Sequence, residues 1–249
     1  MTDDDTAVND VLEALAKNEI ELQEAKRQVK GVHQIDEFAR VDARQGERTG
    51  IPEVVEAERK SDQQTIDIGR ELLSTAGQAI VTGVSDTVRE ELSDTAATTQ
   101  FYERSRTFVG HASDFERPDH DGTVGVVTAG TSDITVAEQA VALSEEMGCA
   151  VETLYDVGVS GIHRLLSERE TLADCDCVIV AAGREGALAT VVAGMVSAPV
   201  IGLPVGTGSG YAGDGEAALL GMLQSCTYLT VVNIDAGFVA GGQAALIAR

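Results

Sequence analysis

The sequence predicts an α/β protein built on a doubly wound parallel sheet, flavodoxin-like or Rossmann-like, with a smaller domain before it. From Thr123 onward, five short apolar runs alternate with five helical stretches. Apolar strands separated by helices indicate a parallel sheet covered on both faces. Five such units are too few for an eight-fold barrel. The expected strands are Val124–Thr128, Ala150–Tyr155, Cys177–Ala181, Val200–Pro204 and Thr230–Ile234, and the expected helices are Val136–Met147, Ile162–Leu172, Ala187–Val196, Glu216–Gln224 and Phe238–Ile247.

The first half of the chain has a different residue pattern, which predicts a mainly helical domain. It is rich in charged residues, and apolar residues recur among them near helical spacing from Val8 to Leu15. A helix over Ser61–Gly77 and a short strand over Ala79–Thr82 follow, and then a helix over Val84–Thr95 with Ser85 or Asp86 as its N-cap. We therefore expect a helical domain at residues 1–118 and an α/β nucleotide-binding domain at residues 119–249.

Composition restricts the partners of the protein. Acidic residues number 41 and basic residues 18, which gives a formal net charge of −23. A body this negative repels phosphate backbones, so nucleic-acid binding is disfavoured. Acid excess with few lysines is typical of proteins kept soluble in a salt-rich cytoplasm and predicts a halophilic host. No apolar run approaches the roughly 18 to 20 residues of a membrane span, and no signal peptide is visible, so we expect a cytoplasmic protein without membrane contact.

The cysteines and histidines do not form a recognisable metal motif. Cys175 and Cys177 make a C-x-C pair, but a zinc site needs a second ligand pair at suitable spacing. Four cysteines in 249 residues are also too few for a disulfide framework. We therefore expect no metal held by the protein alone.

In doubly wound sheets the ligand lies beyond the carboxyl ends of the strands, so the loops there are candidate site segments. The loop after the first expected strand carries Gly130, Thr131, Ser132 and Asp133. Its backbone N–H groups and hydroxyls suit a phosphate at a helix N-terminus. The alternative is an ordinary N-cap made by Ser132 or Asp133.

The loops after the second and third expected strands add charged candidates. His163 suits an acid or base, and Arg164 suits a phosphate or carboxylate, although both are also compatible with a solvated helix end. Glu185 lies between Arg184 and Gly186, where a carboxylate facing a cleft suits a general base.

Two further features come later in the chain. The glycine-rich segment 206–213, which includes Ser209 and Gly210, suits a closing flap or is a flexible surface loop. Cys226 precedes the last expected strand, near the end of a helix whose dipole disfavours a thiolate. It is either a reactive thiol with a positive charge nearby or a buried structural cysteine.

Taken in order, these segments resemble the LarB family over nearly the whole chain. The first half carries FARVDARQGERTGIPEVVEAERKSDQQ (38–64). The second half carries VVTAGTSDITVAEQA (126–140), YDVGVSGIHRLL (155–166), VIVAAGREGALATVVAGMVSAPVIGLP (178–204), LLGMLQSC (219–226) and VVNIDAGF (231–238). The C-terminal domain of LarB is similar to the aminoimidazole ribonucleotide carboxylase/mutase family, so the resemblance implies a flavodoxin-like fold.

The resemblance implies the first step of nickel-pincer cofactor synthesis. CO2 is added to C5 of the pyridinium ring of nicotinic acid adenine dinucleotide, and the phosphoanhydride is hydrolysed to AMP and pyridinium-3,5-biscarboxylic acid mononucleotide. Cys226 matches the position of the nucleophile and Glu185 that of the acid/base. CO2 is a co-substrate, no tightly bound cofactor is implied, and Mg2+ held by substrate phosphates would leave no protein motif. The expected substrate-binding residues are Gly130, Thr131, Ser132, Asp133, His163, Arg164, Gly183, Arg184, Ser209, Gly210 and Asp235.

The sequence departs from the related families at three places. Purine carboxylases have a catalytic His where this chain has Ala187, which disfavours purine carboxylation. LarB sequences carry Asn where Ala236 stands here, and Gly-Lys-Thr near Lys60. The alternatives are therefore an aminoimidazole ribonucleotide carboxylase/mutase and a non-catalytic nucleotide-binding module, to which a thiol at the ring would be of no use. Because the related carboxylases are octamers, we also expect a homo-oligomer.

Overall fold

The computed structural model describes residues 3–29, 31–207 and 210–249 and divides into two compact units. The N-terminal unit comprises Met1–Gln100 and Phe108–Phe115, and the C-terminal unit comprises Phe101–Thr107 and Glu116–Arg249. A single boundary after residue 118 was expected, whereas seven residues of an earlier segment belong with the C-terminal unit. No helix within the described ranges has both the length and the apolar character needed to cross a membrane.

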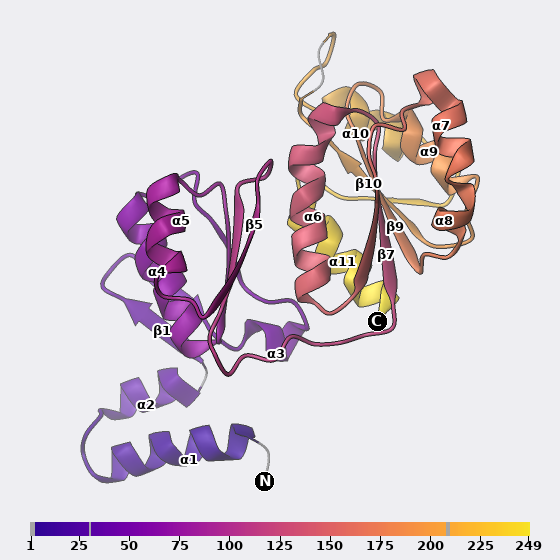
Figure 1. Ribbon diagram of the computed structural model, residues 1–249. Helices are drawn as coiled ribbons and strands as arrows, with labels where there is room; N and C mark the ends of the chain where they lie inside the picture. Colours follow the sequence, from indigo (N-terminus) through magenta and orange to yellow (C-terminus); the bar gives the residue numbers. More distant parts are fainter. Residues whose placement is uncertain (1–2, 30, 208–209) are drawn as a thin grey trace. The chain divides into compact units, whose positions relative to one another are not determined.

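The C-terminal unit is a five-stranded parallel sheet in the order β11-β10-β9-β7-β8 (Figure 1). This is the flavodoxin-like order, so the predicted fold class is confirmed. Every residue of β9 and β10 is buried, which explains why their sequences are continuous apolar runs. The strands are β7 (Thr123–Thr128), β8 (Ala150–Leu154), β9 (Cys177–Ala182), β10 (Val200–Pro204) and β11 (Leu229–Val231).

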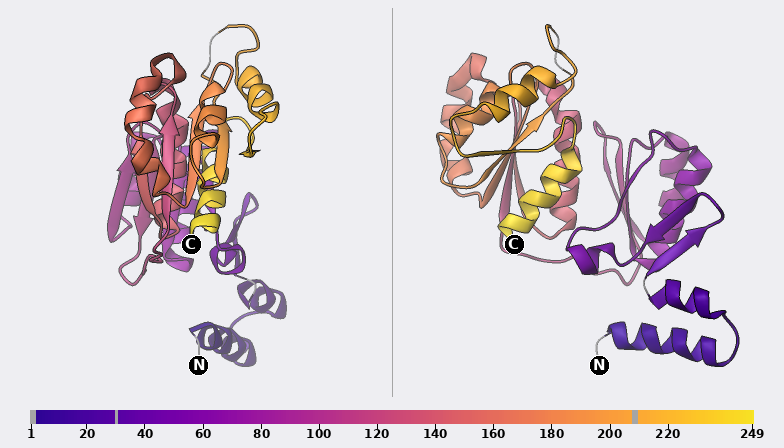
Figure 2. Two further views of the ribbon diagram at one scale, coloured as in Figure 1. Left: turned by 90° about the vertical axis from the view of Figure 1, so that its right-hand side faces the viewer. Right: turned by 180° about the vertical axis from the view of Figure 1, so that it is seen from behind.

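Helices cover both faces of this sheet (Figures 1 and 2). On one face lie α6 (Ile134–Glu146) and α11 (Gly237–Ala248), whose backbones approach closely because a Cβ at Gly241 would lie 2.6 Å from the Ala140 carbonyl oxygen. The other face is covered by α7 (Ile162–Ser167), α8 (Arg169–Ala173), α9 (Ala187–Ala193) and α10 (Glu216–Leu223). The expected single helix at 162–172 is broken at Glu168, whose backbone leaves the helical conformation.

The segment Phe101–Thr107 contacts α6 within the C-terminal unit. The Glu138 carboxylate accepts hydrogen bonds from the backbone N–H groups of Arg104 (3.0 Å) and Ser105 (2.9 Å). The hydroxyl of Tyr102 donates to the carboxylate of Glu145, about two turns after Glu138 on the same helix. Backbone and side-chain hydrogen bonds therefore anchor this segment to the helix.

In the N-terminal unit helices account for more residues than strands, as predicted, but α4 packs against a four-stranded sheet, β3-β4-β6-β5. Only β4 was predicted: β1, β2 and β3 are short, β5 begins with three polar residues, and β6 (TFVGH) was missed although all of its residues are buried. The helices are α1 (Asp3–Ala16), α2 (Leu22–Val29), α3 (Gln45–Thr49), α4 (Asp62–Thr75) and α5 (Asp86–Ser93), and the strands are β1 (Val32–Ile35), β2 (Ala39–Asp42), β3 (Val54–Glu56), β4 (Gln78–Thr82), β5 (Thr98–Tyr102) and β6 (Thr107–His111). Ser61 and Ser85 accept the N-capping hydrogen bonds of α4 and α5.

Candidate functional site

A cavity of about 390 Å3 lies at the carboxyl edge of the parallel sheet. The loops after β7, β8 and β9 line it, as expected for a doubly wound fold. Among the predicted site residues, it brings together Gly130, Ser132, Asp133, Gly183, Arg184 and Glu185. Thr131 is exposed and does not line the cavity.

Asp133 organises the first of these loops. Only 4% of it is exposed, and burial raises the pKa of its carboxyl group. The carboxylate accepts hydrogen bonds from the backbone N–H of Gly130 (2.8 Å) and from the hydroxyls of Ser132 and Thr207 (3.4 Å each). One of the N–H groups expected to meet a phosphate is therefore already engaged, and the loop is held by its own carboxylate.

Arg184 and Glu185 lie on a tight turn after β9. Arg184 has a left-handed backbone (φ +48°), as does Gly186 (φ +68°), and this turn places both charged side chains in solvent. Neither forms an ion pair with another residue that the structure describes. The backbone of α10 packs directly against this turn. A Cβ at Gly221 of α10 would lie only 2.1 Å from the Glu185 carbonyl oxygen.

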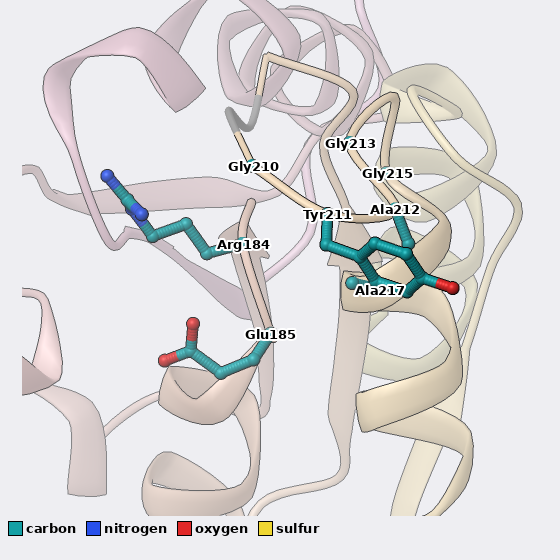
Figure 3. A pocket seen from close by; sticks show the side chains of 8 residues that line it. All are labelled: Arg184, Glu185, Gly210, Tyr211, Ala212, Gly213, Gly215 and Ala217. Atoms are coloured by element: carbon teal, nitrogen blue, oxygen red, sulfur yellow. The ribbon is translucent and has the colours of Figure 1, made fainter.

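A second cavity, of about 260 Å3, is also lined by Arg184 and Glu185 (Figure 3). Its other lining residues come from the glycine-rich segment and the start of α10, including Gly210, Tyr211 and Ala217. Sequence reasoning did not select Tyr211, although an aromatic residue among glycines was a signal for it. Thr207, which binds Asp133, was missed as well. Ser209 lies outside the described residues.

Asp235 anchors the start of the glycine-rich segment. Its carboxylate accepts a hydrogen bond from the Gly206 backbone N–H at 2.8 Å, and its own backbone is left-handed (φ +56°). Asp235 lines neither cavity, and its side chain instead holds the loop that begins at Gly206.

His163 and Arg164 also lie outside both cavities. The guanidinium of Arg164 donates to the Asp156 carboxylate at 2.6 Å, and the Asp156 backbone N–H donates to the Thr128 hydroxyl at 3.0 Å. His163 is exposed. The expected anion-binding pair is therefore partly occupied by an ion pair inside the chain.

Cys226 is exposed and lines neither cavity. It lies in the loop that leads from α10 to the beginning of β11, whereas Glu185 follows the end of β9. The two segments are joined through α10, because Gly221, five residues before Cys226, packs against the Glu185 carbonyl oxygen. Hydrogen bonds hold this loop, since the Thr190 hydroxyl donates to Ser225 at 2.9 Å and the Ser225 and Thr227 hydroxyls lie 2.7 Å apart.

Metal-ligating side chains do not cluster in the part of the chain that the structure describes. There, no group of three or more His, Cys, Asp or Glu residues is arranged to hold an ion. The other cysteines, Cys149, Cys175 and Cys177, are all buried.

The fold and the cavity define a doubly wound α/β protein with a candidate ligand site at the carboxyl edge of its sheet. Residues 123–249 match the AIR carboxylase family, and residues 32–112 match the LarB/PurE-like N-terminal domain. The chain therefore belongs to the LarB family, in which a LarB/PurE-like N-terminal domain precedes an AIR carboxylase domain. This domain composition is that of a carboxylase- or mutase-type enzyme.

Individual relatives extend over different parts of the chain. An uncharacterized protein of Methanocaldococcus jannaschii is 39% identical over 254 residues, which cover 97% of each chain. A crystal structure of a Treponema denticola PurE2 variant is similar over 49% of this chain and 76% of that chain, with 20% identity and a TM-score of 0.41.

Proposed function

We propose that this protein carboxylates the pyridinium ring of nicotinic acid adenine dinucleotide and hydrolyses its phosphoanhydride. The products are AMP and pyridinium-3,5-biscarboxylic acid mononucleotide. The observation that carries the proposal is the position of Glu185, an exposed carboxylate in the wall shared by two neighbouring cavities of a LarB-family chain. Ala187, which lines the first cavity where the purine enzymes have a catalytic His, favours this substrate over a purine precursor.

The chemistry requires a nucleophile and a base. A pyridinium ring is electron-poor, so C5 does not attack CO2 unaided. Addition of a thiolate to C4 gives a neutral dihydropyridine whose enamine carbon, C5, forms the new bond to CO2. Glu185 then removes the C5 proton, and expulsion of the thiolate from C4 restores the aromatic ring. The net change is replacement of a ring proton by a carboxylate.

The second step is hydrolysis of the phosphoanhydride. Water attacks one phosphorus, the bridging P–O bond breaks, and AMP leaves with the bridging or the incoming oxygen. Mg2+ coordinated mainly by the two phosphates and by water would stabilise the charge on the leaving phosphate, and it requires few protein ligands.

The nucleophile in this proposal is Cys226, and it comes from a second copy of the chain. Glu185 lines both cavities and Cys226 lines neither, so these cavities of a single chain do not bring the two residues together. The surface around Cys226 supports a homo-oligomer. The α10 sequence, EAALLGML, is apolar on every side after its first residue, yet Leu220, Leu223 and the nearby Tyr228 are exposed. Helices of this kind are usually covered by other protein.

Complementation between inactive variants tests the function and the shared site together. We expect Cys226→Ser and Glu185→Gln each to abolish incorporation of 13C-bicarbonate into the mononucleotide product, measured by mass spectrometry in molar KCl, while dinucleotide binding persists. Subunits of the two variants, dissociated and reassembled at equal amounts, should recover about a quarter of wild-type activity, because random assembly leaves that fraction of sites intact. The double variant assembled with itself is the control and should stay inactive.

Each result has a distinct meaning. Wild-type rates in Cys226→Ser would contradict covalent catalysis, and no recovery on mixing would place both residues in one chain. Release of AMP without 13C in the product of the wild-type protein would define a hydrolase that lacks the carboxylation step.

The match to the AIR carboxylase family favours a second candidate, a carboxylase or mutase acting on aminoimidazole ribonucleotide. The same labelled assay with that ribonucleotide distinguishes the two. Folded wild-type protein that binds nucleotide but turns over neither substrate would favour a non-catalytic binding module.

A further inference from the structure

The two cavities are neighbours that share one wall. Arg184 and Glu185 line both, and the cavities measure about 390 and about 260 Å3. Pockets for small molecules commonly occupy about 300 to 1,000 Å3, so the pair is suited to a ligand with two bulky parts joined by a linker. The shared wall is where such a linker would lie.

The linings of the two cavities differ in chemistry. The first contains the polar loop of Ser132 and Asp133 together with Thr207, whose oxygens suit the hydroxyls of a sugar. The second is lined by glycines, alanines and Tyr211, and the side chain of Tyr211 is fully exposed. In Figure 3, Arg184 and Glu185 project to one side of the turn, and the ring of Tyr211 projects to the other side, toward Ala217 at the start of α10. A free aromatic ring beside small residues suits a nucleobase, which stacks on aromatic side chains.

Arg184 has the properties of a phosphate ligand at this junction. Its side chain is exposed and has no ion-pair partner among the described residues, whereas Arg70, Arg117 and Arg164 each pair with a carboxylate. The planar guanidinium donates two parallel hydrogen bonds to phosphate oxygens. In a chain with a net charge of −23, an unpaired cation in the shared wall favours an anion there.

We propose that the dinucleotide is bound in two subsites joined at Arg184. The first cavity takes the pyridinium mononucleotide half, the second takes the adenosine half against Tyr211, and Arg184 binds the phosphoanhydride between them. The identity of the dinucleotide rests on the proposed function. In this arrangement Arg184 also neutralises the charge that develops on the AMP phosphate when the bridging P–O bond breaks.

Binding of the separate halves tests the assignment without catalysis. We expect Tyr211→Ala to weaken binding of AMP, measured by isothermal titration calorimetry, by about tenfold, the scale of one base–aromatic stack. Its affinity for nicotinic acid mononucleotide should stay within about twofold. Tyr211→Phe keeps the ring and should retain AMP affinity. Arg184→Met should weaken both halves and weaken the intact dinucleotide most, because the dinucleotide places both phosphates at that position.

A matched control is Arg169→Met, which removes another exposed arginine that lines neither cavity. It should change none of the three affinities. Equal weakening of AMP and of the mononucleotide by Tyr211→Ala, or competition of the two halves for one site, would overturn the two-subsite assignment. If Tyr211 and Arg184 behave as stated while wild-type protein incorporates no 13C, the subsites stand and the proposed carboxylation fails.

Discussion

The four cysteine side chains of this protein differ in burial and in the pKa of their thiols. Burial raises the pKa of Cys177 to about 12 and that of Cys175 to about 11, and it raises the pKa of Cys149 as well. Cys226 is exposed. Because the thiolate is the reacting form, the three buried cysteines combine poor access with little thiolate at neutral pH.

We therefore predict that iodoacetamide at pH 8 modifies Cys226 alone in the native protein. Peptide mass spectrometry should find one labelled thiol per chain, and Cys226→Ser should leave none. Denaturation in urea should expose all four thiols and serves as the control. Labelling of Cys175 or Cys177 before unfolding would show that the sheet edge opens more readily than its burial indicates.

The loops that line the first cavity were predictable, whereas the partners of the charged residues and the contribution of Thr207 were not. Glu185 and Asp133 follow different strands, but carboxyl ends of parallel strands meet at one edge, so their proximity follows from the pattern of runs. The hydrogen bond from the Gly130 backbone N–H to the Asp133 carboxylate depends on the conformation of the loop, which the spacing of residues in the sequence does not specify. The ion pair of Arg164 with Asp156 likewise depends on local geometry that spacing does not specify, since Asp156 has a left-handed backbone.

At the scale of helices and strands, the packing of α10 on the Glu185 turn is the most specific feature. Gly221 lies inside a helix, where glycine costs about 1 kcal/mol relative to alanine. It is nevertheless required there, because a Cβ would approach the Glu185 carbonyl oxygen to 2.1 Å. The helix therefore positions the proposed base through its backbone.

We predict that Gly221→Ala displaces the Glu185 turn. Overpacking of this kind costs about 1 to 3 kcal/mol of unfolding free energy, and a displacement near 1 Å lowers turnover by about 100-fold. Urea unfolding and the labelled carboxylation assay measure the two effects. Gly194→Ala, at the end of α9, is the control, because its Cβ would meet nothing closer than 3.4 Å. A Gly221→Ala protein as stable and active as wild type would show that the turn does not depend on this contact.

The five strand–helix units of the C-terminal unit were found from sequence because each buried strand is a continuous apolar run. The N-terminal sheet was largely missed for the opposite reason. β5, with the sequence TTQFY, has no fully buried residue and shows no apolar alternation, so its pairing is set by neighbouring strands. β6 is buried at every position and was also missed, because its apolar run is only Phe108 and Val109. A buried strand is therefore found from sequence only where its apolar run is long enough to be recognised.

The whole molecule carries a charge of −23, and this bears on its stability. Like charges repel one another in the compact state, and the repulsion is screened over a Debye length of about 10 Å at 0.1 M salt and 3 Å at 1 M. The prediction of a halophilic host rests on this balance.

We therefore predict that the urea midpoint of unfolding rises steadily as KCl is increased from 0.1 M to 2 M. Circular dichroism at each salt concentration measures the midpoint, and light scattering on the same samples follows the oligomer. A midpoint that falls or stays constant would mean that self-repulsion is not a significant term and that the acidic surface has no link to salt.

The anchoring of Phe101–Thr107 to α6 bears on where the C-terminal unit can be separated from the rest of the chain. A fragment that starts after residue 118 lacks the hydrogen bonds that Glu138 accepts from the backbone of Arg104 and Ser105 and the one that Glu145 accepts from Tyr102. A C-terminal unit produced by itself would keep these three bonds only if its chain began before Phe101.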